Sequence, residues 1–293
     1  MAFESMEEWI QRCREADLTM AEAVVQEDMM DRAVSREETV SQMELMWEAM
    51  CRSEKDYDRT LTSHSGLVGG AAGQMEDYLK KADPLCGDRI GLVIMRALRL
   101  AESNACMKRI VAAPTAGACG VLPAVMVTVF GQNSFSDEQM EEALFVSAGI
   151  GQVIAHRAYI AGASGGCQAE IGTASSMAAG ALVYLKGGSM QQVSDAAAIA
   201  MKNLLGLVCD PVAGLVEVPC VKRNVVGAVN AMSAADMALA GIRSAIPADQ
   251  VFDAMRDVGD QMNRTLRETA EGGLADTPAG RAVSERLEKE SGF

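Results

Sequence analysis

Aromatic side chains are scarce in this chain: Phe, Trp and Tyr together make up 4% of its 293 residues, although 49% of the residues are hydrophobic. The core must therefore be built mainly from Ala, Val, Leu, Ile and Met, and the 20 Met residues can fill irregular gaps. Only seven Pro residues interrupt the chain. No stretch alternates apolar and polar residues with many β-branched side chains, which argues against a β-sheet. We therefore predict an all-α fold.

Long apolar runs and basic clusters are also missing. Residues 121–130 are apolar but too few to span a bilayer, and the first 16 residues are acidic and amphipathic, unlike a secretory signal peptide. A net charge of −14 without a Lys/Arg cluster is unsuited to nucleic acid or anionic membranes. We expect a cytoplasmic protein that binds neither, and whose eight Cys residues are thiols or metal ligands.

Signals for helix starts recur along the chain. In each, a Ser or Thr stands three residues before a Glu or Gln, so that the two side chains can satisfy backbone N–H groups reciprocally; the pairs are Thr19/Glu22, Ser35/Glu38, Ser136/Gln139 and Ser189/Gln192. Apolar spacing predicts a helix over residues 88–105, and Pro247 suits the first turn of a helix that runs toward Glu268. Residues 173–185 and 224–241 have few polar residues on any side, which predicts central buried helices.

Charge is distributed unevenly along the chain. Residues 1–60 hold 16 acidic and 7 basic side chains, which accounts for nine of the 14 net negative charges. We interpret this acidity as solvated helical faces, and predict an acidic N-terminal helical segment, residues 1–60, packed on the core. In residues 61–293 we expect helices that alternate with glycine-rich loops, which lie at residues 63–73, 114–120, 162–172, 206–214 and 272–280.

The Cys residues fall into two groups. Four lie in helical patterns or a simple turn, where inert thiols are common: Cys13, Cys51, Cys86 and Cys106. Four lie in or beside Gly/Pro loops: Cys119, Cys167, Cys209 and Cys220. The last three are 42 and 11 residues apart, which matches neither a zinc knuckle nor a Cys-x-x-Cys pair. Thiolates from separate glycine-containing loops suit an iron–sulfur cluster, but composition alone favours structural thiols in turns.

Five motifs together carry a resemblance to a known family: SHSGLVGG at residues 63–70, AAPTAGACG at 112–120, GGCQAEIG at 165–172, LVCDPV with VPCVKRN at 207–224, and ETAEGGLA at 268–275. Over nearly its whole length the chain resembles the α subunit of bacterial iron–sulfur-dependent L-serine dehydratase (L-serine ammonia-lyase). The resemblance implies an all-α catalytic domain, residues 61–293, whose glycine-rich loops converge on a cluster site. It also implies conversion of L-serine to pyruvate and ammonia.

By this resemblance, Cys167, Cys209 and Cys220 match the family's three ligands of an oxygen-sensitive [4Fe–4S] cluster. The implied partner is a separate β subunit, which single-chain relatives carry fused to the catalytic part, and we expect an oligomer. Some single-chain relatives add a C-terminal Cys as a fourth, displaceable iron ligand. This chain has no Cys after Cys220, so its fourth iron site is expected to be open, water-bound or capped by another group.

Dehydration of serine needs a Lewis acid for the hydroxyl, which leaves poorly, and a base for the weakly acidic α-proton. Three thiolates on four irons leave one iron open for the first task. The predicted catalytic residues are His64, Ser63 and Ser65, and the two serines could donate hydrogen bonds to the substrate carboxylate. His64 is a candidate base or carboxylate contact, with a surface imidazole as the equal alternative. His156 lies in a helical stretch and is interpreted as structural.

The predicted substrate-binding residues are Gly66, Pro114, Thr115, Gly117 and Gly120. The loop at 114–120 enters an apolar helix, where free N–H groups favour an anion such as the substrate carboxylate. Without the resemblance, a helix-connecting turn is the preferred interpretation of both loops. Three further residues near the cysteines are candidate outer groups: Glu170, Lys222 and Asn224. Cys119 is not predicted to be a ligand, because the family pattern tolerates small non-thiol residues there.

Three other functions compete with this hypothesis. An L-cysteine desulfidase would use a similar cluster to remove sulfide. A pyridoxal-phosphate lyase needs a Schiff-base lysine, and none of the eight lysines stands in a sequence context typical of that class. A non-catalytic helical thiol or metal scaffold would use the same cysteines without turnover.

Overall fold

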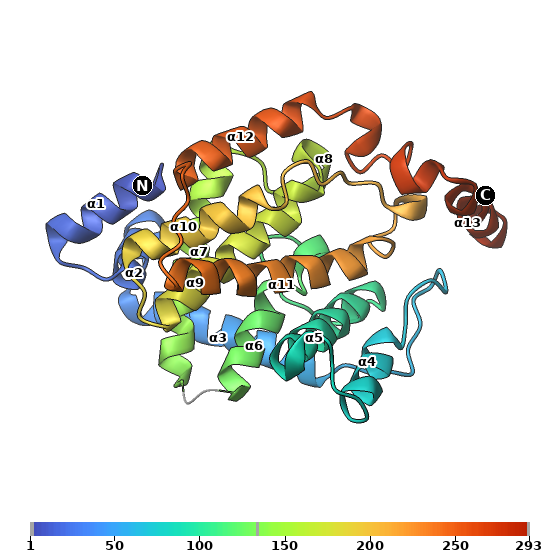
Figure 1. Cartoon of the computed structure of the whole chain (residues 1–293), viewed down its shortest axis with the longest axis horizontal. Coiled ribbons are helices and arrows are strands. Elements are labelled where there is room, and N and C mark those ends of the chain that lie inside the picture. The colour runs from blue at the N-terminus through green and yellow to red at the C-terminus, as the bar shows by residue number, and fades with distance from the viewer. Residues whose placement is uncertain (1–2, 133–134, 292–293) are drawn as a thin grey trace.

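The computed structural model describes residues 3–132 and 135–291. Within them the chain is helical, and the only extended pairing is one isolated bridge between Cys209 and Arg267, which confirms the all-α prediction (Figure 1). The α-helices are α1 (Met6–Ala16), α2 (Met20–Arg32), α3 (Arg36–Lys55), α4 (Ala71–Leu79), α5 (Gly87–Ala105), α6 (Leu122–Gln132), α7 (Asp137–Arg157), α8 (Gly162–Gly165), α9 (Thr173–Leu185), α10 (Met190–Lys202), α11 (Cys220–Leu239), α12 (Ala248–Gln261) and α13 (Pro278–Ser291). No helix among the described residues is both long and apolar enough to cross a membrane.

The predicted caps begin several of these helices. Ser35, Ser136 and Ser189 each form the reciprocal pair of hydrogen bonds with the Glu or Gln three residues later. Thr19 caps α2 by accepting from the Glu22 N–H. No return bond from the Glu22 carboxylate to Thr19 is found in the described structure, because that carboxylate instead accepts from Gln26 and Arg36. Local sequence therefore sets these helix starts, and a surface ion pair modifies one of them.

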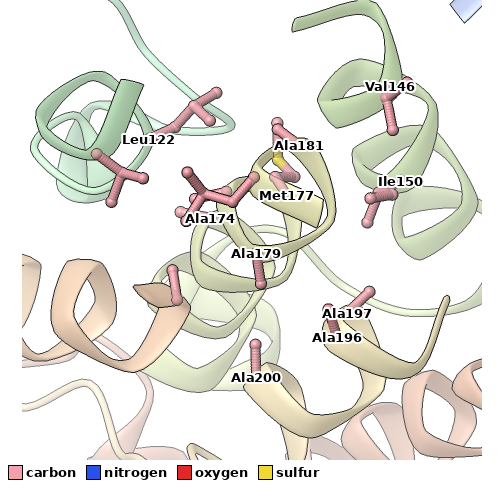
Figure 2. Packing of buried hydrophobic residues seen from close by; sticks show 14 of the residues in the cluster. Leu122, Val146, Ile150, Ala174, Met177, Ala179, Ala181, Ala196, Ala197 and Ala200 are labelled. Atoms are coloured by element: carbon pink, nitrogen blue, oxygen red, sulfur yellow. The ribbon is translucent and has the colours of Figure 1, made fainter. Parts of the chain in front are cut away.

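Helix α9 lies at the centre of the molecule, as its sequence predicts. All of its residues from Thr173 to Val183 are buried, and it contacts α6, α7, α10 and α11. Figure 2 shows small side chains where α9 and α10 approach, among them Ala179, Ala196 and Ala197. A core poor in aromatic rings is thus made by bringing helix backbones close together.

The first three helices pack on this core. Phe3 stacks on Trp9 with ring centroids 5.2 Å apart, and both are buried in the same hydrophobic cluster as α7 and α9. From α3, the Trp47 indole N–H donates to the Asp137 carboxylate at 2.7 Å, at the start of α7. The division at residue 60 stays a prediction, and the predicted segments 1–60 and 61–293 include residues 1–2, 133–134 and 292–293, which lie outside the described residues.

Three predictions about local structure are wrong. Helix α11 has an exposed face, where Val226 is 50% exposed and Lys222 and Ser233 are exposed as well. Residues 162–172 are helical rather than a loop, and form α8 followed by a π-helical turn, Gln168–Gly172. Helix α12 ends at Gln261 instead of running toward Glu268.

The early end of α12 has a clear cause. The Cys209 N–H donates to the Leu266 carbonyl at 2.8 Å, and the Glu268 N–H donates to the Cys209 carbonyl at 2.7 Å. Residues 266–268 therefore pair in extended form with Cys209 instead of continuing the helix, so α12 ends before them.

Candidate functional site

The three predicted ligand cysteines stand at the ends of three elements. Cys167 precedes the π-helical turn that leads into α9, Cys209 lies between α10 and α11, and Cys220 is the first residue of α11. All three side chains are buried, with 2%, 3% and 8% of the residue exposed, and all three are free thiols. The packing of α9, α10 and α11 therefore carries thiols that are distant in sequence toward one region.

Burial and nearby charges both raise the pKa values of these thiols. Burial raises the pKa of Cys167 to about 12 and that of Cys220 to about 11. The pKa of Cys209 is raised as well, first by burial and then by the negative charges of Cys167, Glu170, Glu268 and Cys220. The thiols are thus within electrostatic range of one another, in a region where burial disfavours negative charge.

Arg223 joins the segments that carry these cysteines. Its guanidinium donates to the Val208 carbonyl and to the Asp210 carboxylate, each at 2.7 Å, and so contacts the residues on both sides of Cys209. Its positive charge also acts on Cys167 and opposes the effect of burial on the pKa of that thiol. Burial alone would lower the pKa of Arg223, but the Cys167 thiolate and the Asp210 carboxylate together raise it. Arg223 lies in the first turn of α11, the helix that begins at Cys220. This buried cation therefore holds the segment of Cys209 against the start of that helix.

A second set of contacts places the loop at 114–120 against the cysteines. The Thr115 hydroxyl donates to the Glu170 carboxylate at 2.7 Å. A Cβ atom on Gly117 would lie 2.9 and 3.1 Å from the two oxygens of that carboxylate, so only glycine allows this approach. Burial raises the pKa of Glu170, and the negative charge of Glu268 raises it further. The hydrogen bond from Thr115 lowers the pKa but does not cancel these effects.

Asn224 fixes the same loop to helix α11. Its side-chain amide donates to the carbonyls of Gly117 at 2.8 Å and Cys220 at 3.0 Å, and its carbonyl oxygen accepts from the Gly120 N–H at 2.8 Å. Asn224 is 1% exposed. Because these bonds join both Gly117 and Gly120 to the first turn of α11, this one buried side chain holds the loop beside Cys220.

Gly162 marks the point where these groups meet. A Cβ atom there would lie 2.9 Å from the Cys209 Sγ, 3.0 Å from a Glu170 oxygen and 3.3 Å from a Glu268 oxygen. One thiol and two carboxylates therefore surround the start of α8. Within residues 3–132 and 135–291, however, no three His, Cys, Asp or Glu side chains form a group that could hold one metal ion.

The predicted catalytic residues lie on a separate loop. Ser63 and Ser65 are buried, and both hydroxyls donate to the Glu217 carboxylate, that of Ser63 at 2.8 Å. His64 and Gly66 are exposed. His64, Ser65 and Glu217 line a cleft of about 650 Å³ that α13 borders. No hydrogen bond in the described structure joins this loop to Thr115 or Glu170.

Pro114 faces elsewhere. It borders a different cavity of about 550 Å³, whose lining includes Met43, Met50 and Met177. Lys222, a candidate outer group, is exposed on α11, whereas Glu170 and Asn224 are in contact with the loop at 114–120. The structure thus brings Thr115, Gly117 and Gly120 to the cysteines.

Comparison with known proteins decides the family. The family model described as serine dehydratase alpha chain matches residues 15–275. This chain belongs to that family. The matched range contains the three cysteines, Asn224, Glu217 and the loop of His64.

The relatives cover nearly all of the chain. It is 44% identical over 285 residues to the probable L-serine dehydratase, alpha chain, of Bacillus subtilis (strain 168), covering 97% of this chain and 95% of the relative. It is 39% identical over 284 residues to the L-serine dehydratase, alpha chain, of Peptoniphilus asaccharolyticus, covering 97% of each. L-serine dehydratase 1 of Escherichia coli (strain K12) is 37% identical over 285 residues, which is 93% of this chain but 61% of that longer protein.

Sequence reasoning missed two residues of this serine dehydratase family member. Arg223 and Glu217 are the charged residues that organise the two halves of the site, and neither was predicted. Glu217 stands between Val216 and Val218, where a lone carboxylate in an apolar stretch signals a buried partner. Arg223 sits in the VPCVKRN motif beside Lys222, so sequence alone gave no reason to separate a buried cation from an exposed one.

Proposed function

We propose that this chain dehydrates and deaminates L-serine to pyruvate and ammonia, with a [4Fe–4S] cluster held by Cys167, Cys209 and Cys220. The observation that carries the proposal is that three free thiols are buried, that Cys167 and Cys220 both raise the pKa of Cys209, and that Asn224 fixes the loop at 114–120 to Cys220. The relatives that cover nearly the whole chain are named L-serine dehydratases, which supports L-serine as the substrate.

The donor set suits an iron–sulfur group, because Cys thiolates are the usual protein ligands of such clusters. The charges of Cys167 and Cys220 both act on Cys209, so the three thiols share one electrostatic environment. The buried thiols have high pKa values, so a bound metal would supply the positive charge that a thiolate there needs. When bound, the cluster would supply a Lewis-acid iron for the leaving hydroxyl.

The chain's own residues would carry out the remaining steps. Thr115, Gly117 and Gly120 border the place for the substrate, and the loop's N–H groups orient its carboxylate. We propose that the α-proton passes to His64, which lies on a separate loop and lines a different cleft, so that this loop and the loop at 114–120 would have to face the same substrate. Removal of water gives aminoacrylate, which tautomerises and hydrolyses to pyruvate and ammonia without help from the protein. The burial of Cys167 and Cys209 keeps bulk water from the sulfurs.

A β subunit is part of this proposal. The relatives from B. subtilis and P. asaccharolyticus are named alpha chains, and the E. coli relative extends well beyond the part that this chain matches. We propose that a separate β chain associates with this one in an oligomer and that the assembly acts in the cytoplasm in amino-acid degradation.

The test is anaerobic purification of the chain, alone and co-expressed with a β chain, followed by iron and sulfide quantitation and a pyruvate assay with L-serine. We expect brown protein that forms pyruvate, and bleaching with loss of activity in air. Turnover of L-cysteine but not L-serine would favour a desulfidase. If both preparations lack iron and show no turnover, the result would favour the non-catalytic helical scaffold.

A further inference from the structure

Glu217 is a buried carboxylate that lies between the two halves of the site. It is 7% exposed, and it stands in the segment between Cys209 and Cys220. Its Oε2 accepts hydrogen bonds from the hydroxyls of Ser63, at 2.8 Å, and Ser65, and these two hydroxyl oxygens are 3.2 Å apart. A buried carboxylate is costly unless donors compensate it, so these contacts strongly favour one arrangement of the serines.

The two serine hydroxyls also fix the backbone of the turn that follows them. The Ser65 hydroxyl accepts from the Leu67 N–H at 3.0 Å, and the Ser63 hydroxyl accepts from the Val68 N–H at 3.2 Å. Ser63 and Ser65 are 4% and 1% exposed, while His64 between them is exposed. Because the neighbours on both sides of His64 are bound inward, the His64 side chain is directed outward, where it lines the cleft.

Glu217 also sets this loop relative to the cysteines. Its carbonyl accepts from the Val221 N–H at 3.0 Å, in the first turn of α11, and Cys220 begins that helix. From the opposite side of the cleft, Arg286 of α13 donates to the Ser65 carbonyl at 2.6 Å. The position of His64 is therefore tied to Cys220 through one side chain.

We propose that Glu217 is a positioning residue that holds His64 in place for proton removal, and that Ser63 and Ser65 are the hydroxyls through which it acts. This inference rests on the proposed function. It differs from the sequence prediction that the two serines take part in the chemistry themselves.

The experiment compares Glu217→Ala, Glu217→Gln and Ser65→Ala in the anaerobic holoprotein with its β chain, each with and without His64→Ala. Displacing a base by about 1 Å can cost about 100-fold in rate, so Glu217→Ala should lower kcat by about that factor with little change in KM. Glu217→Gln keeps an oxygen that accepts from the serines and should restore much of kcat. In the His64→Ala background, Glu217→Ala should cost little more. The exposed Glu285→Ala of α13 is the matched control.

Amide hydrogen exchange supplies a readout that does not depend on turnover. Glu217→Ala should speed exchange at Leu67 and Val68, whereas Glu285→Ala should not. If Glu217→Ala does not fold, Ser65→Ala and Glu217→Gln carry the comparison. An equal loss of kcat with and without His64 would overturn the inference while leaving the proposed function intact. If the wild-type holoprotein makes no pyruvate, the proposed function is wrong. If, in addition, exchange at Leu67 and Val68 is unchanged in Glu217→Ala, the positioning role of Glu217 is wrong as well.

Discussion

The Arg223 guanidinium donates to the Asp210 carboxylate at 2.7 Å, and both side chains are largely buried, with 14% and 4% exposed. Asp210 also accepts from the Leu274 N–H at 2.8 Å, which brings the 268–275 motif to the same place. A buried ion pair needs such additional donors to offset the loss of water. The pair therefore links the segment of Cys209, the helix of Cys220 and the chain after α12.

Removing the Arg223 charge tests this link. Arg223→Met keeps much of the side-chain volume but removes the donor of the Val208 carbonyl and the positive partner of Asp210, which keeps only its bond from the Leu274 N–H. Since groups that orient metal ligands typically contribute about 10- to 100-fold to metal affinity, we expect reduced iron after anaerobic reconstitution. Iron and sulfide per chain are the measurement. Arg36→Met, which breaks an exposed ion pair with Glu22, is the control and should retain full iron. A full complement of iron in Arg223→Met would contradict the role given to Arg223.

The ligand assignment is tested against a thiol in a similar environment. We expect Cys167→Ala, Cys209→Ala and Cys220→Ala each to lose the cluster's visible absorbance and pyruvate formation. Cys119 is the matched control, because it is 1% exposed and burial raises its pKa to about 12, yet its thiol contacts the Leu100 carbonyl instead of the other cysteines. Cys119→Ala should keep the absorbance. A Cys209→Ala protein with an intact cluster would refute the assignment.

Local features of the sequence predicted much of the fold. Ser35, Ser136 and Ser189 begin helices where their capping pairs predict them, and residues 173–185 form the central helix. These features depend on neighbours a few residues apart, so a single sequence contains the information.

The polar contacts of the site could not be predicted in the same way. Glu217 meets Ser63 across 154 residues, and Asn224 meets Gly117 across 107. Such pairs leave no periodic signal, because their partners are set by how helices pack rather than by spacing. The same reason explains the early end of α12, where the chain pairs with Cys209. Similarity of motifs predicts the three ligand cysteines, but it did not predict the contacts that Arg223 and Glu217 make near them.

The close approach of Gly117 to Glu170 leads to a prediction about substrate binding. Gly117→Ala would place a methyl group 2.9 and 3.1 Å from the carboxylate oxygens, so either Glu170 or the loop must move. We expect KM for L-serine to rise by about 10-fold, with a smaller change in unfolding free energy. Steady-state kinetics and urea unfolding measure the two effects. Gly131→Ala in α6 is the control, because its new methyl group would meet nothing closer than 3.8 Å. An unchanged KM would mean that the loop does not contact substrate.

Glu141 leads to a prediction about stability and pH. It lies buried in α7, and its pKa is raised from an ordinary 4.5 to about 7, first by burial and then by the charges of Glu44 on α3 and of Glu138 and Asp137 on α7. The folded protein therefore binds this proton more tightly than the unfolded chain does. The resulting stability is fully present below pH 4.5 and is lost as the pH rises through about 7.

Glu141→Gln removes the charge but keeps the shape, so it should be more stable than the wild type at pH 8, by on the order of 1 kcal/mol, and similar to it at pH 4. Urea unfolding of the two proteins from pH 4 to pH 8 measures the difference. Glu142→Gln is the control, because the Glu142 carboxylate is exposed and an amide oxygen can still accept from the Tyr184 hydroxyl. Parallel stability curves for Glu141→Gln and the wild type would show that the Glu141 carboxylate is not held in its neutral form, and that the acidic faces of α3 and α7 are screened by water where they meet.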